Sequence, residues 1–509
     1  MAVSDDLYQL ISSLSMSEKR YLRIFSTRHV KGEKNIYLQL FDTIIALREP
    51  DDDAVKAALE DSDIRQKLNK HKHYLYNLIL RSLNAYHADH SGEARFRETM
   101  RSVEILYQRG LFDQSRKVLR KARRMAEELQ RIPELLAVSD WEQNLLSKSS
   151  QYGRMAELVE RDEVLVDELR HEKQAKLLVF RMYDRLLQFG AAPDTQDLAE
   201  LKRMMDDPVI SLHTNQRFHV RYLISMANIV CANAMDDKDS FLHHCDETVR
   251  IFEENPVFIT ERPNLFVSAL LNQCKANLQC DRLDEVSRVL DRIRAFQSAS
   301  EVRMQKHTIA NIVYETTHID LLCSLKQSDL KKADRIIRES EADLERYLPT
   351  VTRSLALSLR FDAAYAYFLL GMTDRCLVWL NRLLNDQEYH IRMQLHAVAR
   401  LFSMVVHLQL GNDSLVEYTA RSIKLELRKW DFAKATASAL VRFFSVYTQA
   451  DEPAKQRRLT EALMSDLTQI RNEGTERDVY NLFDFSMWAE SLLEQKPMVA
   501  LIGKDKSVP

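Results

Sequence analysis

The segment YQRGLFDQSRKVLRKA, residues 107–122, carries the clearest structural pattern in this chain of 509 residues. Tyr107 is followed at close spacing by Gly110, Phe112 and Ser115, and apolar or small residues then recur on one helix face. A glycine permits a tight reversal after a helix, an aromatic side chain can pack back across it, and a small serine lets two helices approach closely. The segment therefore predicts one helical hairpin.

Similar hairpins recur along the chain. A second copy surrounds Gly371, and a third surrounds Gly411. The first residue after each predicted turn is apolar except for Thr373, and it recurs at steps of 42 to 47 residues, at Phe112, Met155, Leu198, Phe241, Leu283, Leu330, Thr373 and Leu415. This spacing resembles the tetratricopeptide repeat, whose units have about 34 residues, so each helix here is longer by roughly one turn.

The resemblance implies an all-α, right-handed α-solenoid of tetratricopeptide-like hairpins with a period of about 43 residues. Composition also favours helices, because Gly 9 and Pro 10 are too few for the many tight turns of a sandwich, a barrel or a doubly wound sheet. We expect four parts: an N-terminal helical cap or small module at 1–90, the solenoid at 91–429, capping helices at 430–495 and a disordered tail at 496–509.

The sequence lacks the residue groupings that common catalytic and cofactor sites need. It has no Gly-rich phosphate loop, no GxSxG elbow and no HExxH helix. His243, His244 and Cys245 are neighbours, but adjacent helical residues point about 100° apart and cannot share a metal without other ligands. We therefore expect a non-enzymatic protein with no catalytic residue, no metal and no cofactor.

Charge segregates between alternate predicted helices, although the net charge is only −3. The first helices of five hairpins carry eleven bases against two acids, near 173–190, 215–235, 264–280, 353–371 and 390–411. The second helices near 155–171, 195–207 and 240–254 are mostly acidic. In the family that the chain resembles, first helices line the concave groove, so the resemblance implies a basic groove and an acidic back.

Residues spaced four apart on a helix face the same way, which groups Arg181 with Arg185 and Arg217 with Arg221. The predicted partner-binding residues are Arg181, Arg185, Arg217, Arg221, Tyr222, Arg360, Arg392 and Arg400. One alternative stays open, namely that these arginines lie on ordinary solvated faces and pair with acids on neighbouring helices. The basic helix at 113–130 could likewise be a separate patch or merely solubilising.

These observations favour a protein–protein interaction scaffold that binds an acidic or extended segment of another protein in the basic groove. The alternative is a nucleic-acid-binding or transcriptional regulatory protein that uses its N-terminal helices. This alternative is supported by a stretch that mixes basic and aromatic residues, namely Lys67, Lys70, His71, Lys72, His73, Tyr74, Tyr76 and Arg81.

The start of the chain, MAVSDDLYQL, lacks the basic end and continuous apolar stretch of a secretory signal. No apolar run approaches the roughly 18 residues that a membrane span needs. The six cysteines include no CxxC pair, which is typical of buried small residues in a reducing compartment. We therefore expect a cytoplasmic protein that does not contact membranes.

Overall fold

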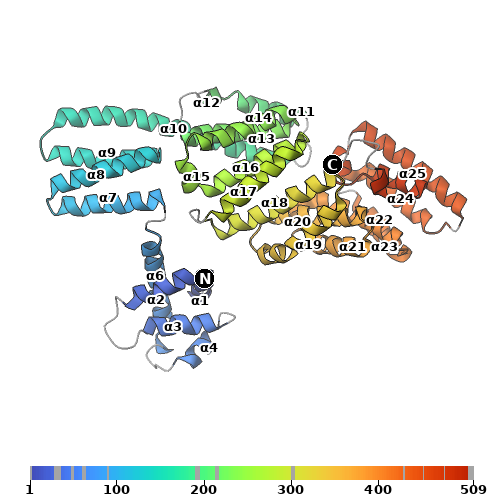
Figure 1. The fold of residues 1–509 in the computed structure, drawn as a ribbon, viewed down its shortest axis with the longest axis horizontal. Coiled ribbons are helices and arrows are strands. Elements are labelled where there is room, and N and C mark those ends of the chain that lie inside the picture. The colour runs from blue at the N-terminus through green and yellow to red at the C-terminus, as the bar shows by residue number, and fades with distance from the viewer. Residues whose placement is uncertain are drawn as a thin grey trace. The chain divides into compact units, whose positions relative to one another are not determined.

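The computed structural model describes residues 3–27, 36–47, 51–59, 65–88, 91–189, 195–211, 217–299, 304–427, 430–450, 452–474 and 476–501. Within these ranges every regular element is a helix and no strand is present (Figure 1). The predicted all-α fold class is therefore confirmed. The chain divides into two compact units, Met1–Arg170 and His171–Pro509.

The first unit begins with a small helical bundle that has its own apolar core. The bundle comprises α1 (Val3–Ser13), α2 (Met16–Thr27), α3 (Ile36–Ala46), α4 (Asp52–Ala58) and α6 (Leu68–Tyr86). Its core cluster is drawn from these helices and the residues next to them, and Leu40 and Phe41 at its centre are fully buried. The longest helix of the bundle is α6, which contacts α1, α2 and α3.

The second part of this unit stacks α7 (Gly92–Gln108), α8 (Phe112–Glu128), α9 (Ile132–Ser147) and the first half of α10 (Tyr152–Phe189) (Figure 1). The predicted packing of the first hairpin is confirmed. Gly110 has a φ of 73°, and the Phe112 ring lies edge-on to the Tyr107 ring at 5.3 Å. Ser115 is fully buried and its hydroxyl donates to the carbonyl of Val103 at 3.0 Å, so α7 and α8 meet at close range.

Helix α10 corrects one predicted hairpin junction. The sequence predicts a second helix at 155–171 followed by a first helix at 173–190, whereas the structure has one continuous helix from Tyr152 to Phe189. No residue of this stretch has a positive φ, and the segment LRHEKQAKLL at 169–178 consists almost entirely of good helix formers. Spacing alone predicted a turn in a segment that contains no glycine, proline or asparagine.

The second unit continues as helices that contact their neighbours along the chain. They are α11 (Thr195–Met205), α12 (Pro208–Ser211), α13 (Phe218–Ala234), α14 (Lys238–Glu253), α15 (Val257–Glu261), α16 (Pro263–Gln279), α17 (Leu283–Ser298), α18 (Lys306–Lys326), α19 (Leu330–Tyr347), α20 (Arg353–Leu369), α21 (Thr373–Leu384), α22 (Met393–Gln409) and α23 (Asp413–Glu426), with a short 3-10 helix, η2 (Tyr389–Arg392), before α22. Besides its hairpin partner, α18 contacts the earlier α16 and the later α20, and α20 in turn contacts α22. Each helix is thus buried mainly by elements close to it in sequence.

One turn motif ends eight of these helices. After α7, the amide of Leu111 donates to the carbonyl of Leu106 at 2.9 Å, across the left-handed Gly110. The same bond to the carbonyl five residues earlier closes α8, α9, α13, α16, α18, α20 and α22, with left-handed residues Gln130, Ser150, Asp236, Asp281, Ser328, Gly371 and Gly411. This Schellman motif satisfies carbonyls at the helix end and reverses the chain within three or four residues.

The C-terminal helices extend the apolar core of the last hairpins. They are η4 (Asp431–Ala433), α24 (Lys434–Tyr447), α25 (Pro453–Glu473), α26 (Arg477–Leu482), α27 (Phe485–Glu494) and η5 (Met498–Ala500). The predicted disordered tail is wrong as far as Leu501, because Met498 and Leu501 are buried in this core. The remaining tail residues, 502–509, lie outside the described residues.

A buried carboxylate fixes the chain between α21 and α22. The Asp386 side chain has no exposed surface and lies 2.9 Å from Arg360 Nη1, while Arg353 Nε donates to it at 3.0 Å. Burial alone would raise the pKa of Asp386, but the hydrogen bond from Arg353, the amide of Glu388 and the two guanidinium charges lower it overall. The ionised carboxylate therefore stabilises the folded state.

Gly371→Ala tests the left-handed turns. No atom lies within 4 Å of an added Cβ, so the cost is backbone strain alone, and we expect a loss of about 1–2 kcal/mol in the free energy of unfolding, measured by urea titration. Gly153→Ala is the matched control, because its Cβ also meets open space but Gly153 lies within α10. It should leave stability unchanged or slightly higher. Equal losses in both variants would contradict this account of the turn.

Asp386→Asn tests the buried carboxylate. Removing one partner of a buried ion pair should cost about 3 kcal/mol of unfolding free energy at neutral pH. Because the folded pKa is depressed, this contribution is complete above the unfolded value of about 3.9 and is lost as the pH falls through the folded pKa. The gap between wild type and variant should therefore close in acid. Asp343→Asn, on the exposed face of α19, is the control that should change little.

Candidate binding sites

The structure pairs several of the predicted groove arginines with acids on their own hairpins. Arg185 on α10 lies 2.7 Å from Glu200 on α11, and Arg221 on α13 lies 2.8 Å from Glu254 after α14. In the same way Arg400 on α22 lies 2.7 Å from Glu426 on α23, and its guanidinium stacks over the Trp430 ring at 5.5 Å. These arginines already hold first and second helices together.

The other predicted residues have different positions. Arg360 is bound to the buried Asp386, and Arg392 at the end of η2 donates to the Ser354 hydroxyl at 3.4 Å. Arg217 is the N-cap residue of α13. The Tyr222 ring stacks on Phe218 at 6.1 Å, and burial raises the pKa of its phenol, so it belongs to the core of the α13–α14 hairpin.

Arg181 differs from these residues because its side chain is exposed on α10 and has no ion-pair partner within the described ranges. The eight predicted residues therefore do not form a single unpaired basic surface. The alternative left open by the sequence, that such arginines pair with acids on neighbouring helices, holds for Arg185, Arg221 and Arg400. Arg360 instead pairs with the buried Asp386 in the connection between α21 and α22.

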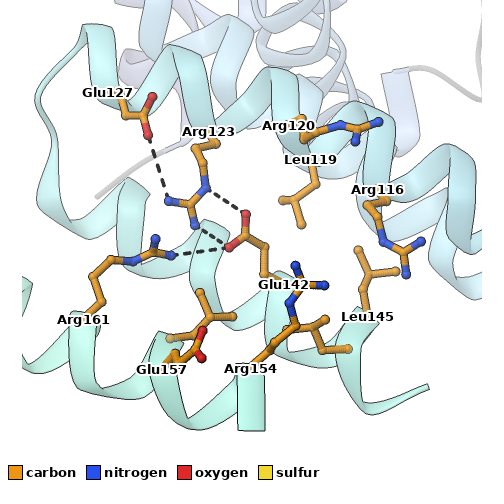
Figure 2. A pocket seen from close by; sticks show the side chains of 12 residues that line it. Arg116, Leu119, Arg120, Arg123, Glu127, Glu142, Leu145, Arg154, Glu157 and Arg161 are labelled. Carbon is orange, nitrogen blue, oxygen red and sulfur yellow. Dashed lines mark hydrogen bonds and ion pairs between the residues drawn. The ribbon is translucent and has the colours of Figure 1, made fainter. Parts of the chain in front are cut away.

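A basic pocket forms where the sequence had left the role of helix 113–130 undecided. It has a volume of about 480 Å³ between α8, α9 and α10, and its lining is Arg116, Leu119, Arg120, Arg123, Glu127, Glu142, Leu145, Leu146, Arg154, Glu157, Leu158 and Arg161 (Figure 2). Leu119 and Leu145 are almost fully buried and form an apolar floor. We call this the α8–α10 pocket.

The charges of the α8–α10 pocket are only partly satisfied. Arg123 Nε donates to Glu142 at 2.8 Å, and Arg161 lies 3.7 Å from the same carboxylate (Figure 2). Arg120 is exposed with no acidic partner among the described residues. Within the same described ranges, Arg154 donates to the neutral Gln151 amide oxygen at 3.0 Å and has no acidic partner. Five arginines face three glutamates, which leaves an excess of positive charge beside an apolar floor.

The basic and aromatic stretch of the N-terminal bundle also comes together, with two exceptions. Lys67, Lys70, His71, His73, Tyr74 and Arg81 line one pocket. Lys72 is instead buried and paired with Asp52 on α4, and Tyr76 packs against the bundle core. A helix must turn part of any basic run inward, so these two residues do not belong to the surface.

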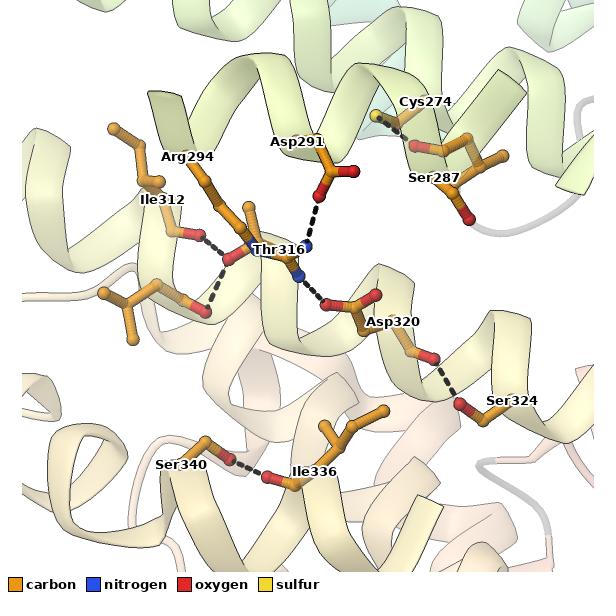
Figure 3. A network of polar contacts seen from close by, with 12 residues as sticks. Cys274, Ser287, Asp291, Arg294, Ile312, Thr316, Asp320, Ser324, Ile336 and Ser340 are labelled. Carbon is orange, nitrogen blue, oxygen red and sulfur yellow. Dashed lines mark hydrogen bonds and ion pairs between the residues drawn. The ribbon is translucent and has the colours of Figure 1, made fainter. Parts of the chain in front are cut away.

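A polar network between α17 and α18 lines a further cavity of about 720 Å³ (Figure 3). Arg294 donates to Asp291 at 3.0 Å on its own helix and also pairs with Asp320 on α18. Burial raises the pKa of Asp320, and the Arg294 charge offsets part of that rise. Because Arg294 pairs with an acid on each helix, this network connects α17 to α18.

On α14, His243 and His244 acquire a third potential ligand from the next turn. The ligand atoms of His243, His244 and Glu247 lie within 4.8 Å of one another, and His244 Nδ1 is 3.4 Å from the Glu247 carboxylate. Cys245 points into the core instead. The adjacent residues considered from the sequence alone provide too few ligands for a metal. Glu247 supplies the additional ligand, because it lies four residues after His243 and three after His244 on the same helix.

Sequence reasoning missed Arg154, Arg161 and Glu142 of the α8–α10 pocket, and Tyr37 of the N-terminal pocket. These residues lie on α9, α10 and α3, whereas the basic patterns seen in the sequence lie on α8 and α6. The i, i+4 spacing of Arg116 and Arg120 on a single helix was the available signal. The facing residues could not be assigned because they lie on α9 and α10, and the sequence does not show which side chains of those helices turn toward α8.

In comparisons with known proteins, no family model matches this chain and no curated protein is similar to it. The structure is all-helical with many packed helices, which is compatible with a helical repeat protein. Among the described helices, none combines the length and the apolar character needed to cross a lipid bilayer.

The cysteines provide a prediction about reactivity. Burial raises the pKa of Cys245 and Cys274 to about 12 and that of Cys323 to about 11, and it also raises the pKa of Cys231 and Cys376. Cys280 is the partly exposed one. Because the thiolate is the reactive form, native protein treated with a chromogenic disulfide should release one fast equivalent, and Cys280→Ser should abolish it. A fast phase that survives in Cys280→Ser would show that another thiol is accessible.

Proposed function

We propose that this protein is a non-enzymatic protein–protein interaction scaffold that binds an acidic segment of a partner protein. The observation that carries the proposal is the α8–α10 pocket, where Arg116, Arg120 and Arg154 surround an apolar floor. Arginine forms strong, bidentate hydrogen bonds with carboxylates, and a leucine floor accepts apolar side chains. An acidic segment with interspersed apolar residues satisfies both features.

The pocket suits a polypeptide better than a polyphosphate. Its three glutamates would repel a ligand with negative charge at every unit, whereas a peptide can place neutral or apolar residues beside them. The predicted groove residues support the same function less directly, because Arg185, Arg221 and Arg400 are engaged in ion pairs within their own hairpins. A partner would have to displace those acids before binding there.

We infer a right-handed, tetratricopeptide-like solenoid with a period near 43 residues, which would present extended surfaces to a partner. Its support is the recurrence of one Schellman turn after α13, α16, α18, α20 and α22, together with contacts between successive hairpins. The expectation of a cytoplasmic location is part of the same proposal.

The test is binding of a short fluorescent peptide of glutamate and leucine to the full chain, followed by anisotropy. The double variant Arg120→Glu/Arg154→Glu should weaken binding at least about tenfold, since each change replaces attraction by repulsion in the pocket. A matched peptide with lysine in place of glutamate should not bind.

The control variant is Arg97→Glu/Arg101→Glu, which makes the same charge change on the exposed face of α7. It should bind the acidic peptide nearly as well as wild type does, with unchanged circular dichroism. The proposal fails if the acidic peptide does not bind, or if the two double variants lose equal affinity.

A further inference from the structure

The N-terminal bundle contains a second basic pocket, between α3 and α6. It has a volume of about 400 Å³ and is lined by Tyr37, Lys67, Lys70, His71, His73, Tyr74, Asn77, Leu78 and Arg81. This lining includes no carboxylate, whereas the α8–α10 pocket contains three. The two pockets of the first unit therefore differ in the charge that they can tolerate in a ligand.

The positive groups of this pocket follow one face of α6. Lys67, Lys70, Tyr74 and Arg81 are separated by three, four and seven residues, so they lie along a single stripe. Lys70 and Arg81 are exposed and have no ion-pair partner among the described residues, and the helical rise places them roughly 16 Å apart along the axis. That length accommodates more than one phosphate of an extended strand.

The aromatic groups form a stacked pair at the centre of the stripe. The Tyr37 and Tyr74 rings stack with centroids 4.2 Å apart at an interplanar angle of 23°. Tyr74 remains 44% exposed, so part of its ring is open to a ligand. Beside this pair, the buried Nε2 of His71 has no hydrogen-bond partner, and the His71 ring lies 6.0 Å from the Tyr37 ring.

We propose that this pocket binds single-stranded nucleic acid. Lys70 and Arg81 contact backbone phosphates, and Tyr74 stacks on a base while Tyr37 supports it from behind. Single-stranded binders combine a positive track with aromatic platforms in this manner. A duplex does not fit this assignment, because its base faces are already stacked on one another.

This inference goes beyond the proposed protein-binding function and depends on a different pocket. The α8–α10 pocket and the N-terminal pocket share no residue, so the two activities can be removed separately. An acidic protein segment is the competing ligand for the N-terminal pocket. It offers charge but no planar base, and it would leave the exposed Tyr74 ring without a stacking partner.

The experiment measures anisotropy of a labelled single-stranded thymidine oligonucleotide with the full chain. Two or three phosphate contacts predict a log–log salt slope of about −1.4 to −2.1, which is a loss of about 7- to 20-fold between roughly 50 and 200 mM salt. Lys70→Glu/Arg81→Glu should weaken binding at least about tenfold and flatten the slope. Tyr74→Ala should weaken binding about 5- to 100-fold with an unchanged slope, while Tyr74→Phe should bind like wild type.

Two controls separate this site from the rest of the molecule. Arg97→Glu/Arg101→Glu makes the same charge change elsewhere in the first unit and should not alter oligonucleotide binding, and neither should Arg120→Glu/Arg154→Glu. Lys70→Glu/Arg81→Glu should in turn retain the acidic peptide. The inference is overturned if no oligonucleotide binds at about 50 mM salt, if Tyr74→Ala binds like wild type, if a duplex binds as tightly as the single strand, or if polyglutamate competes as well as the oligonucleotide.

Discussion

Nine helix ends among the described residues, the eight between α7 and α22 and the end of α27, depend on one residue in the left-handed conformation, followed by an amide that bonds to the carbonyl five residues earlier. Between α7 and α23 this turn lets a helix stop and the next one begin after three or four residues, so consecutive helices lie against each other. Because most burial then comes from neighbours along the chain, the described part of the core is built from helices that follow one another in sequence. Where the turn is absent, as in the middle of α10, the chain continues as one helix of 38 residues.

The second constraint is the use of charge inside the hairpins. Arg185, Arg221 and Arg400 each join a first helix to an acid on or just after the second, and Asp386 gathers two arginines in a buried site. Alternating basic and acidic helices therefore need not signal a bipolar surface. Complementary charge on paired helices is also a way to hold the pairs in register.

The two basic pockets show how the same residue type can suit different ligands. In the α8–α10 pocket, arginines share space with Glu142 and Glu157 above a leucine floor, so the site favours a ligand of mixed character. The N-terminal pocket has no acid in its lining and has stacked tyrosines, so it favours a dense anion with planar groups. Both pockets lie in the first unit, and they share no residue.

The sequence by itself determined the all-α class, most helix bounds in the second unit and the packing of the Gly110 hairpin, because these depend on local periodicity and on residues that stop helices. Glycine in the sequence indicated the turns at Gly110, Gly371 and Gly411. Asp236, Asp281 and Ser328 adopt the same left-handed conformation, but their residue types do not predict it. Only the tertiary structure decided which arginines are paired, that Lys72 points inward, and that Arg154 joins Arg116 and Arg120. The reason is physical: propensity acts along the chain, whereas an ion pair or a pocket requires side chains from helices whose spacing depends on every turn between them.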